Sequence, residues 1–80
     1  MYYVYLIQSI SKSDQRYVGL TTNLKKRLSE HDTGKTVHTN KFKPWELIAY
    51  VGFKDKKKAE DFELCLKQGS GHAFAKKHLW

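Results

Sequence analysis

The stretch YYVYLIQSISKSDQRYVGLT, residues 2–21, decides the fold. Its first eight residues, Tyr2 to Ser9, are rich in the aromatic and β-branched side chains that favour β-strands. The polar run ISKSDQ follows, and a second apolar run extends from Arg16 to Thr21. Two such runs joined by a short polar segment are typical of a β-hairpin. We therefore expect two antiparallel strands at the start of the chain.

A helix is predicted directly after this hairpin. Asn23 can cap a helix through LKKRLSEHDT, residues 24–33, because its side-chain oxygen can accept hydrogen bonds from the first free N–H groups. Gly34 stands where a left-handed residue often follows the last turn, so the helix should end near residue 33. The polar and basic residues 35–43 and Pro44 predict a loop.

The remaining sequence predicts one more strand and two helices. WELIAYVGF, residues 45–53, is expected to form the third strand. Asp55 can cap a second helix that ends near QGSG, residues 68–71, and Ser70 can cap a short terminal helix over HAFAKKHL, residues 72–79. The order ββαβαα predicts an α+β fold, with a small three-stranded antiparallel sheet flanked by helices.

Size and charge limit the class of protein. The chain has 80 residues, of which 40% are hydrophobic and 14% aromatic, so we expect one compact domain over residues 1–80 without a large enclosed cavity. Fifteen Lys and Arg against eight Asp and Glu give a net charge of +7, which favours nucleic acid or an anionic membrane surface as partner. A basic surface that only aids solubility is the alternative.

The cysteine, the histidines and the chain start exclude other classes. Cys65 is the only cysteine, so no intramolecular disulfide can form, and we interpret it as a half-buried thiol. The four histidines show no paired zinc-ligand spacing with each other or with Cys65. The apolar start is far too short for a membrane span and lacks the basic beginning of a secretion signal. We expect a cytoplasmic protein with no membrane partner.

The second helix carries an acidic residue on its apolar face. At about 100° of rotation per residue, Ala59, Phe62 and Leu66 form one stripe, and Glu63 lies in its middle. A carboxylate is rarely fully buried without a partner, because its desolvation is unfavourable. Glu63 therefore needs either a structural ion pair with Arg27 or a polar groove where it binds a divalent metal. Spacing alone leaves both open.

The first helix also places polar residues among apolar ones. Leu24, Arg27, Leu28 and His31 fall within one arc of this helix. An arginine at a core edge often lays its alkyl stem on apolar side chains and keeps its head in water. This reading stays open for Arg27, and a similar one stays open for His31.

The chain resembles the GIY-YIG nuclease family. The resemblance rests on Tyr3-Val4-Tyr5, Tyr17-Val18-Gly19, Arg27, His31 and Glu63, whose order and spacing match the family pattern over nearly the whole chain. It is strongest with small stand-alone bacterial members, which resemble the amino-terminal nuclease domain of the excinuclease C subunit. The resemblance implies a metal-dependent endonuclease that hydrolyses DNA phosphodiester bonds with little intrinsic sequence specificity, in DNA repair or recombination.

The resemblance also implies a role for each residue. Glu63 would hold one divalent cation, Mg²⁺ or Mn²⁺, and Arg27 would contact the scissile phosphate. Tyr17 would serve as general base toward water, although an ordinary tyrosine has a pKa near 10 and needs a nearby cation or metal for this. His31 and Tyr5 would orient phosphate or share protons.

Two positions depart from the family pattern. Tyr3 occupies the place of the first glycine in the opening motif, which removes no catalytic group. The asparagine common near the end of the family fold has no clear match in SGHAFAKKHLW, residues 70–80. The alternative function is therefore a noncatalytic nucleic-acid-binding module that retains the fold.

Basic residues near the first helix and in the following loop are expected to contact nucleic acid. Such contacts to phosphate position a strand without reading its sequence, so binding should be salt-dependent and largely nonspecific. Because so small a nuclease has little surface for selection, we also expect a monomer that relies on a protein partner for specificity. The predicted contact residues are Lys25, Lys26, His38, Lys41 and Lys43.

Overall fold

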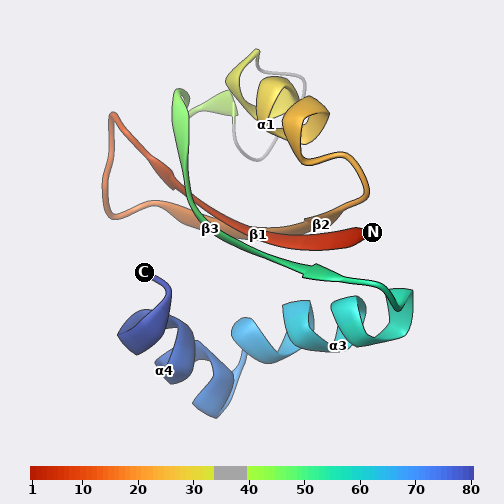
Figure 1. Cartoon of the computed structure of the whole chain (residues 1–80). Coiled ribbons are helices and arrows are strands. Elements are labelled where there is room, and N and C mark those ends of the chain that lie inside the picture. Colours follow the sequence, from red (N-terminus) through yellow and green to blue (C-terminus); the bar gives the residue numbers. More distant parts are fainter. Residues whose placement is uncertain (34–39) are drawn as a thin grey trace.

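The structure is a computed structural model that describes residues 1–33 and 40–80. Within these ranges three strands form one antiparallel sheet in the order β2-β1-β3, and three helices pack around it (Figure 1). The predicted α+β class and the order ββαβαα are confirmed. The elements are β1 (Tyr2–Ser9), β2 (Arg16–Thr21), α1 (Leu24–Asp32), β3 (Trp45–Phe53), α3 (Lys56–Leu66) and α4 (Gly69–His78).

The central strand β1 pairs with both other strands, so β2 and β3 form the two edges of the sheet. All three strands have the bounds that the sequence predicted. In the β1–β2 hairpin, Tyr5 lies opposite Gly19 and Ile7 lies opposite Tyr17. Since partners in register point to the same face, these four residues share one side of the sheet.

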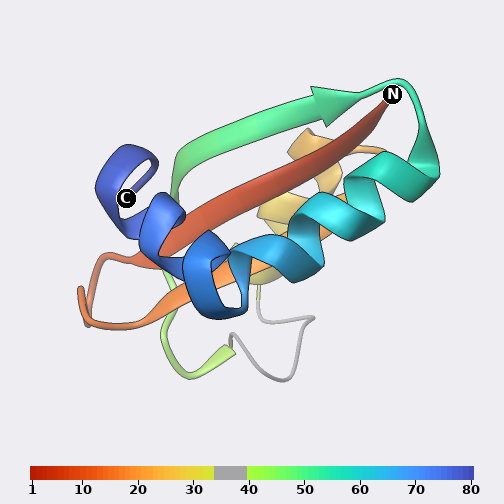
Figure 2. The same ribbon diagram turned by 90° about the horizontal axis from the view of Figure 1, so that it is seen from below.

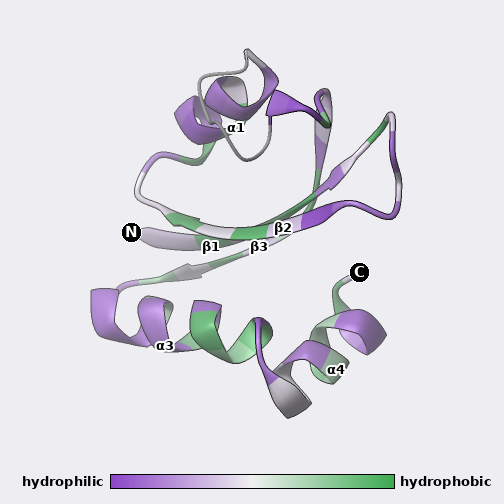
Figure 3. Cartoon of the chain, turned by 180° about the vertical axis from the view of Figure 1, so that it is seen from behind, coloured by the Kyte–Doolittle hydropathy of each residue, from purple (hydrophilic) through white to green (hydrophobic). Residues whose placement is uncertain are grey.

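The helices divide between the two faces of the sheet. Helix α1 covers one face, and α3 and α4 cover the other (Figure 1). Seen from below in Figure 2, α3 and α4 follow one another across the sheet, with α1 on the far side. Helix α1 is largely hydrophilic, whereas the strands between the layers are mostly apolar or neutral (Figure 3).

Alternate residues of the strands feed two separate clusters of buried side chains. Val4 and Leu6 pack against α3 and α4, together with Ala59, Leu66 and Ala75. Tyr5 and Ile7 point to the other face, where they pack with Trp45 and with partly buried side chains of α1. The partly buried partners on that face are Tyr17, Leu24, Leu28 and Phe42.

Two of the three predicted helix caps are formed. The backbone N–H of Lys26 donates to Asn23 Oδ1 at 3.1 Å, and that of Lys57 donates to Asp55 Oδ1 at 3.0 Å. Each bond satisfies one of the N–H groups that a helix start leaves without an intrahelical partner. The two caps therefore fix where α1 and α3 leave the preceding strands.

Two side-chain bonds connect the region after α1 to the sheet. The backbone N–H of Trp45 donates to Asp32 Oδ1 at 2.7 Å, and Ser9 Oγ donates to the Phe42 carbonyl at 2.6 Å. The end of α1, the end of β1 and the start of β3 are thereby held together. The predicted cap residue Gly34 and most of the predicted loop lie outside the described residues.

The start of the last helix differs from the prediction. Helix α4 begins at Gly69, with Gln68 and not Ser70 at the cap position. Gly71 is buried, and a Cβ added there would collide with the backbone carbonyl of Cys65, so close packing against the end of α3 determines where α4 begins. The interpretation of Cys65 as half-buried is also wrong, because its side chain is exposed.

Candidate active site

Two tyrosines from the hairpin lie under α1. The ring centroids of Tyr5 on β1 and Tyr17 on β2 are 6.3 Å apart. Tyr5 is only 1% exposed, whereas Tyr17 is half-buried on the edge strand. Of the two phenols, Tyr17 is therefore the one that solvent and a substrate can reach.

Gly19 makes room for the phenol of Tyr5. A Cβ at this position would collide with the Tyr5 ring and its hydroxyl oxygen. Because the two residues are opposite each other in the β1–β2 register, no side chain larger than hydrogen fits without moving the ring. The glycine of the second motif thus positions the tyrosine of the first.

The buried end of this site holds a histidine. His31 on α1 is fully buried, and its Nε2 lies 2.9 Å from the Tyr5 hydroxyl oxygen. Its ring centroid is 5.2 Å from that of Tyr17. Burial lowers the pKa of His31, and the nearby Arg27 charge lowers it further. The imidazole is therefore neutral at pH 7, and a hydrogen bond joins it to the phenol.

The Tyr5 hydroxyl lies within the electrostatic reach of both flanking helices. Burial is the main cause that raises the pKa of Tyr5 far above its ordinary value, and Tyr17 adds to it. The Arg27 charge on α1 opposes this rise, while the Glu63 charge on α3 reinforces it. Since α1 and α3 cover opposite faces, charges from the two layers act on one hydroxyl near the β2 edge.

Arg27 and Glu63 do not pair with each other within the described part of the chain. Arg27 Nε lies 3.6 Å from Glu30 Oε1, and Lys67 Nζ lies 3.6 Å from Glu63 Oε2. The side chains of Arg27 and Glu63 are 41% and 20% exposed, and such local, partly exposed pairs are weak. The structural Arg27–Glu63 ion pair that the sequence left open is thus absent, and both head groups remain available to a ligand.

A polar pocket of about 330 Å³ lies beside the first turns of α1. Arg27 lines it together with Lys26 and the residues that lead into the helix. Of the predicted nucleic-acid contacts, Lys25, Lys26, Lys41 and Lys43 are exposed, whereas His38 lies outside the described residues. The structure therefore brings Lys26 next to Arg27.

Glu63 fits a magnesium site completed by water and phosphate. Over residues 1–33 and 40–80, no group of three or more His, Cys, Asp or Glu side chains lies close enough to hold a metal by itself. Mg²⁺ is commonly bound through one or two carboxylates, several waters and substrate phosphates. A single partly exposed carboxylate suits that mode, because the substrate and water would supply the missing ligands.

Sequence reasoning missed Lys67 as a neighbour of this site. Its ammonium group is 3.6 Å from the Glu63 carboxylate in the structure. The two residues are four apart on one helix, which places them on the same face, so the spacing carried the signal. A cation beside Glu63 offsets part of its charge when no metal is bound.

The fold, with two phenols and a histidine grouped under α1, is that of a small nuclease domain. Residues 1–77 match the family model described as the GIY-YIG catalytic domain. The chain therefore belongs to the GIY-YIG family, and the resemblance that the sequence indicated is confirmed. Nucleases of this family are generally dependent on a divalent metal.

Two groups of relatives are similar to this chain. "Structure-specific endonuclease subunit SLX1" of Debaryomyces hansenii is 35% identical over 85 residues, which cover 98% of the chain and 23% of the relative. SLX1 of Podospora anserina is 38% identical over 72 residues, or 82% of the chain and 21% of the relative. The chain thus spans under a quarter of the length of these two relatives.

Small bacterial relatives match over more of their length. The UPF0213 protein SpyM3_1077 of Streptococcus pyogenes serotype M3 is 34% identical over 67 residues, which cover 82% of the chain and 71% of the relative. Its size relative to this chain agrees with the resemblance to small stand-alone members.

Proposed function

We propose that this chain is a metal-dependent endonuclease that hydrolyses DNA phosphodiester bonds with little intrinsic sequence specificity. One observation carries the proposal. The Tyr5 and Tyr17 rings lie 6.3 Å apart beside the buried His31, and the charges of Arg27 and Glu63, from helices on opposite faces of the sheet, both act on the Tyr5 hydroxyl. A guanidinium, a carboxylate and an accessible phenol together suit phosphoryl chemistry. The proposed catalytic residues are Tyr5, Tyr17, Arg27, His31 and Glu63.

Glu63 is the proposed ligand of Mg²⁺ or Mn²⁺. When bound, the cation would supply Lewis-acid stabilisation of the phosphate charge and favour deprotonation of water. Glu63 lies on the apolar face of α3 but keeps a fifth of its side chain exposed, so its carboxylate reaches the edge of the layer. That position lets an acidic residue hold a metal without full burial of its charge.

The two tyrosines take different parts in this proposal. Tyr17 would accept a proton from the attacking water as a phenolate that the nearby cation stabilises, because it is the phenol on the open edge strand. Tyr5 cannot accept a proton at neutral pH, because its burial keeps the hydroxyl protonated. It therefore acts as a neutral hydrogen-bonding group that His31 holds in place, and it positions the site from below.

Arg27 binds the scissile phosphate in this proposal. Its guanidinium carries five N–H donors in a fixed fork, which matches the oxygens of a phosphate. Its Nε lies 3.6 Å from Glu30 Oε1, and Lys26 and Glu30 line the same pocket as Arg27. The positive charges of Arg27 and Lys26 would then stabilise the negative charge that develops on the phosphate in the transition state. Lys25, Lys41, Lys43 and His38 extend the proposed contact to flanking phosphates.

The wider biological setting is also part of the proposal. The name of the fungal relatives describes a subunit of a structure-specific endonuclease, which supports DNA as substrate and a protein partner that supplies specificity. We further propose that the chain is a monomer with a single domain over residues 1–80 and that it is cytoplasmic. Its likeness to excinuclease C suits a role in DNA repair or recombination. None of the described helices has the length and apolar character of a membrane span.

A Glu63→Gln variant tests the assignment most directly. The amide keeps the shape of the side chain but removes its charge, so metal-supported cleavage should fall by about 100-fold or more. The measurement is cleavage of labelled branched, flapped, single-stranded and duplex DNA with Mg²⁺ or Mn²⁺, with circular dichroism as the folding control. Retained cleavage would show a wrong site. Binding without cleavage by the unaltered chain would favour the noncatalytic module instead.

A further inference from the structure

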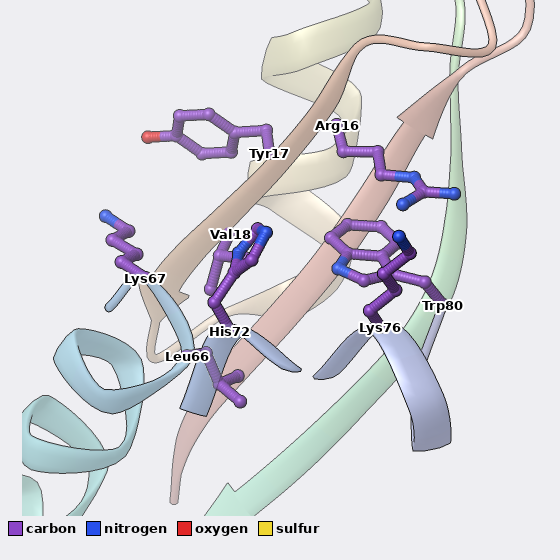
Figure 4. A pocket seen from close by; sticks show the side chains of 8 residues that line it. All are labelled: Arg16, Tyr17, Val18, Leu66, Lys67, His72, Lys76 and Trp80. Carbon is purple, nitrogen blue, oxygen red and sulfur yellow. The ribbon is translucent and has the colours of Figure 1, made fainter. Parts of the chain in front are cut away.

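A second pocket lies against the other face of the β2 edge. Its volume is about 360 Å³, which is at the lower end of the ~300–1,000 Å³ typical of ligand sites. Its walls come from β2, the end of α3, the helix α4 and the last residue (Figure 4). Arg16, Lys67, His72 and Lys76 line it, and none of the described residues in its lining is acidic. The pocket is therefore suited to an anion.

Arg16 is held in place at this pocket. Its guanidinium carbon lies 5.0 Å from the centre of the Trp80 ring, within the range of a cation–π contact. Figure 4 shows the guanidinium beside this ring, with Lys76 nearby. A cation–π contact uses the charge of the guanidinium and none of its N–H donors. These donors therefore remain able to bind an anion in the pocket.

The pocket begins where the candidate active site ends. Arg16 and Tyr17 are consecutive on β2, so their side chains leave the strand on opposite sides, as Figure 4 shows. Tyr17 lines the pocket as well as the catalytic face. Lys67, another lining residue, lies 3.6 Å from the carboxylate of Glu63. A strand whose phosphate reaches Tyr17 and Glu63 therefore continues past this pocket.

We propose that this pocket binds the phosphate and sugar of a nucleotide that flanks the scissile phosphate on the same strand. This inference rests on the proposed function. Arg16 and Lys76 supply the main phosphate contacts, His72 adds a ring N–H, and Lys67 supplies a third cation at the end nearest Glu63. The site contacts backbone groups alone, so it fixes the path of the strand without reading its bases.

The first test measures binding rather than cleavage. In a Glu63→Gln background, Arg16→Gln/Lys76→Gln should bind labelled single-stranded DNA about tenfold more weakly. The slope of log affinity against log salt should fall by about 0.7 for each lost contact. The matched control, Lys56→Gln/Lys58→Gln, removes two exposed charges from the opposite end of α3. Equal losses of DNA affinity in the two double variants would refute the proposed role of the pocket. The absence of DNA binding by Glu63→Gln would also refute it.

The second test locates the contact. Single phosphates along the strand are replaced by neutral methylphosphonates, and the affinity for Glu63→Gln is measured at each position. The phosphate that Arg27 contacts is the one whose replacement no longer weakens binding once Arg27→Gln is added. Replacement of a phosphate close to that one should weaken binding by Glu63→Gln. The same replacement should have no effect when Arg16→Gln and Lys76→Gln are also present. Identical profiles for both proteins would refute the proposal. Cleavage by the unaltered chain is scored separately, so a failed pocket and a failed nuclease assignment give different results.

Discussion

The two faces of the sheet are equally buried along β1 but differ in chemistry. Leu6 and Tyr5 are neighbours in sequence, and both are almost completely inaccessible. Leu6 packs with apolar side chains of α3 and α4, whereas Tyr5 meets an imidazole and a second phenol and is influenced by two opposing charges. One face therefore stabilises the fold, and the other orders groups for the proposed reaction. The burial of a side chain alone therefore does not show whether it stabilises the fold or serves the proposed reaction.

The largest effect on stability should follow a change on the apolar face. Leu6→Ala leaves a cavity beneath α3, and buried leucine truncations typically lower the free energy of unfolding by about 2–5 kcal/mol. Cleavage per folded molecule should stay near that of the unaltered chain, because the side chain points away from Tyr17. Urea unfolding and single-turnover cleavage would check both halves. A loss below about 1 kcal/mol would show that this face carries less of the stability than its packing indicates.

A smaller loss of stability should follow Gly19→Ala, which acts on the face that holds Tyr5. The added methyl group collides with the Tyr5 phenol, and such overpacking typically lowers stability by about 1–3 kcal/mol. Cleavage should also fall, because the phenol must move. Gly52→Ala is the matched control: its Cβ would meet the flexible Met1 side chain at 3.3 Å, which can shift. Equal effects of the two substitutions would contradict the role of Gly19.

Tyr5→Phe should separate chemistry from stability. The change removes the bond to His31 and keeps the ring, so the free energy of unfolding should fall by only about 0.5–1.5 kcal/mol. Cleavage should nevertheless fall by about tenfold or more, because the groups around Tyr17 lose a fixed neighbour. Thermal unfolding and single-turnover rates provide the measurements. An unchanged rate would place Tyr5 with Leu6, as a purely structural residue.

The smallest effect concerns pH. Burial lowers the pKa of His31 below its ordinary value of 6.5, so the unfolded chain binds more protons than the folded one at and below that pH. Stability should therefore decrease as the pH falls from 7 toward 5. A His31→Gln variant should show a shallower decrease over that window, whatever its stability at pH 7. His72→Gln, at an exposed position, is the control, and parallel curves for all three proteins would contradict the assignment.

The strands and the starts of α1 and α3 could be predicted from the sequence because their signals are local. Aromatic and β-branched runs, Asn23 and Asp55 act within a few residues, and the structure confirms each. The start of α4 was wrong because a tertiary contact, Gly71 against the Cys65 carbonyl, decides it. Ser70 is a good cap by composition, but the packing of two helices outweighs that preference.

The site was predictable in its members but not in its contacts. Family spacing brought Tyr5, Tyr17 and Arg27 to attention, yet the bond between Tyr5 and His31 joins residues 26 apart and depends on how α1 crosses the sheet. Helical periodicity placed Glu63 on the apolar face of α3. It could not show that the Glu63 charge acts on the Tyr5 hydroxyl, because that depends on where α3 lies across the strands.

The tie between Asp32 and Trp45 bears on the length of the connecting segment. Together with the bond from Ser9 to Phe42, it anchors the chain on both sides of residues 33–41 by contacts that do not depend on how many residues lie between. Doubling the length of a connecting segment costs only about 0.6 kcal/mol of closure entropy. A change in the length of the connection between Asp32 and Phe42 should therefore alter the stability of the fold little, because these two bonds hold its ends in place.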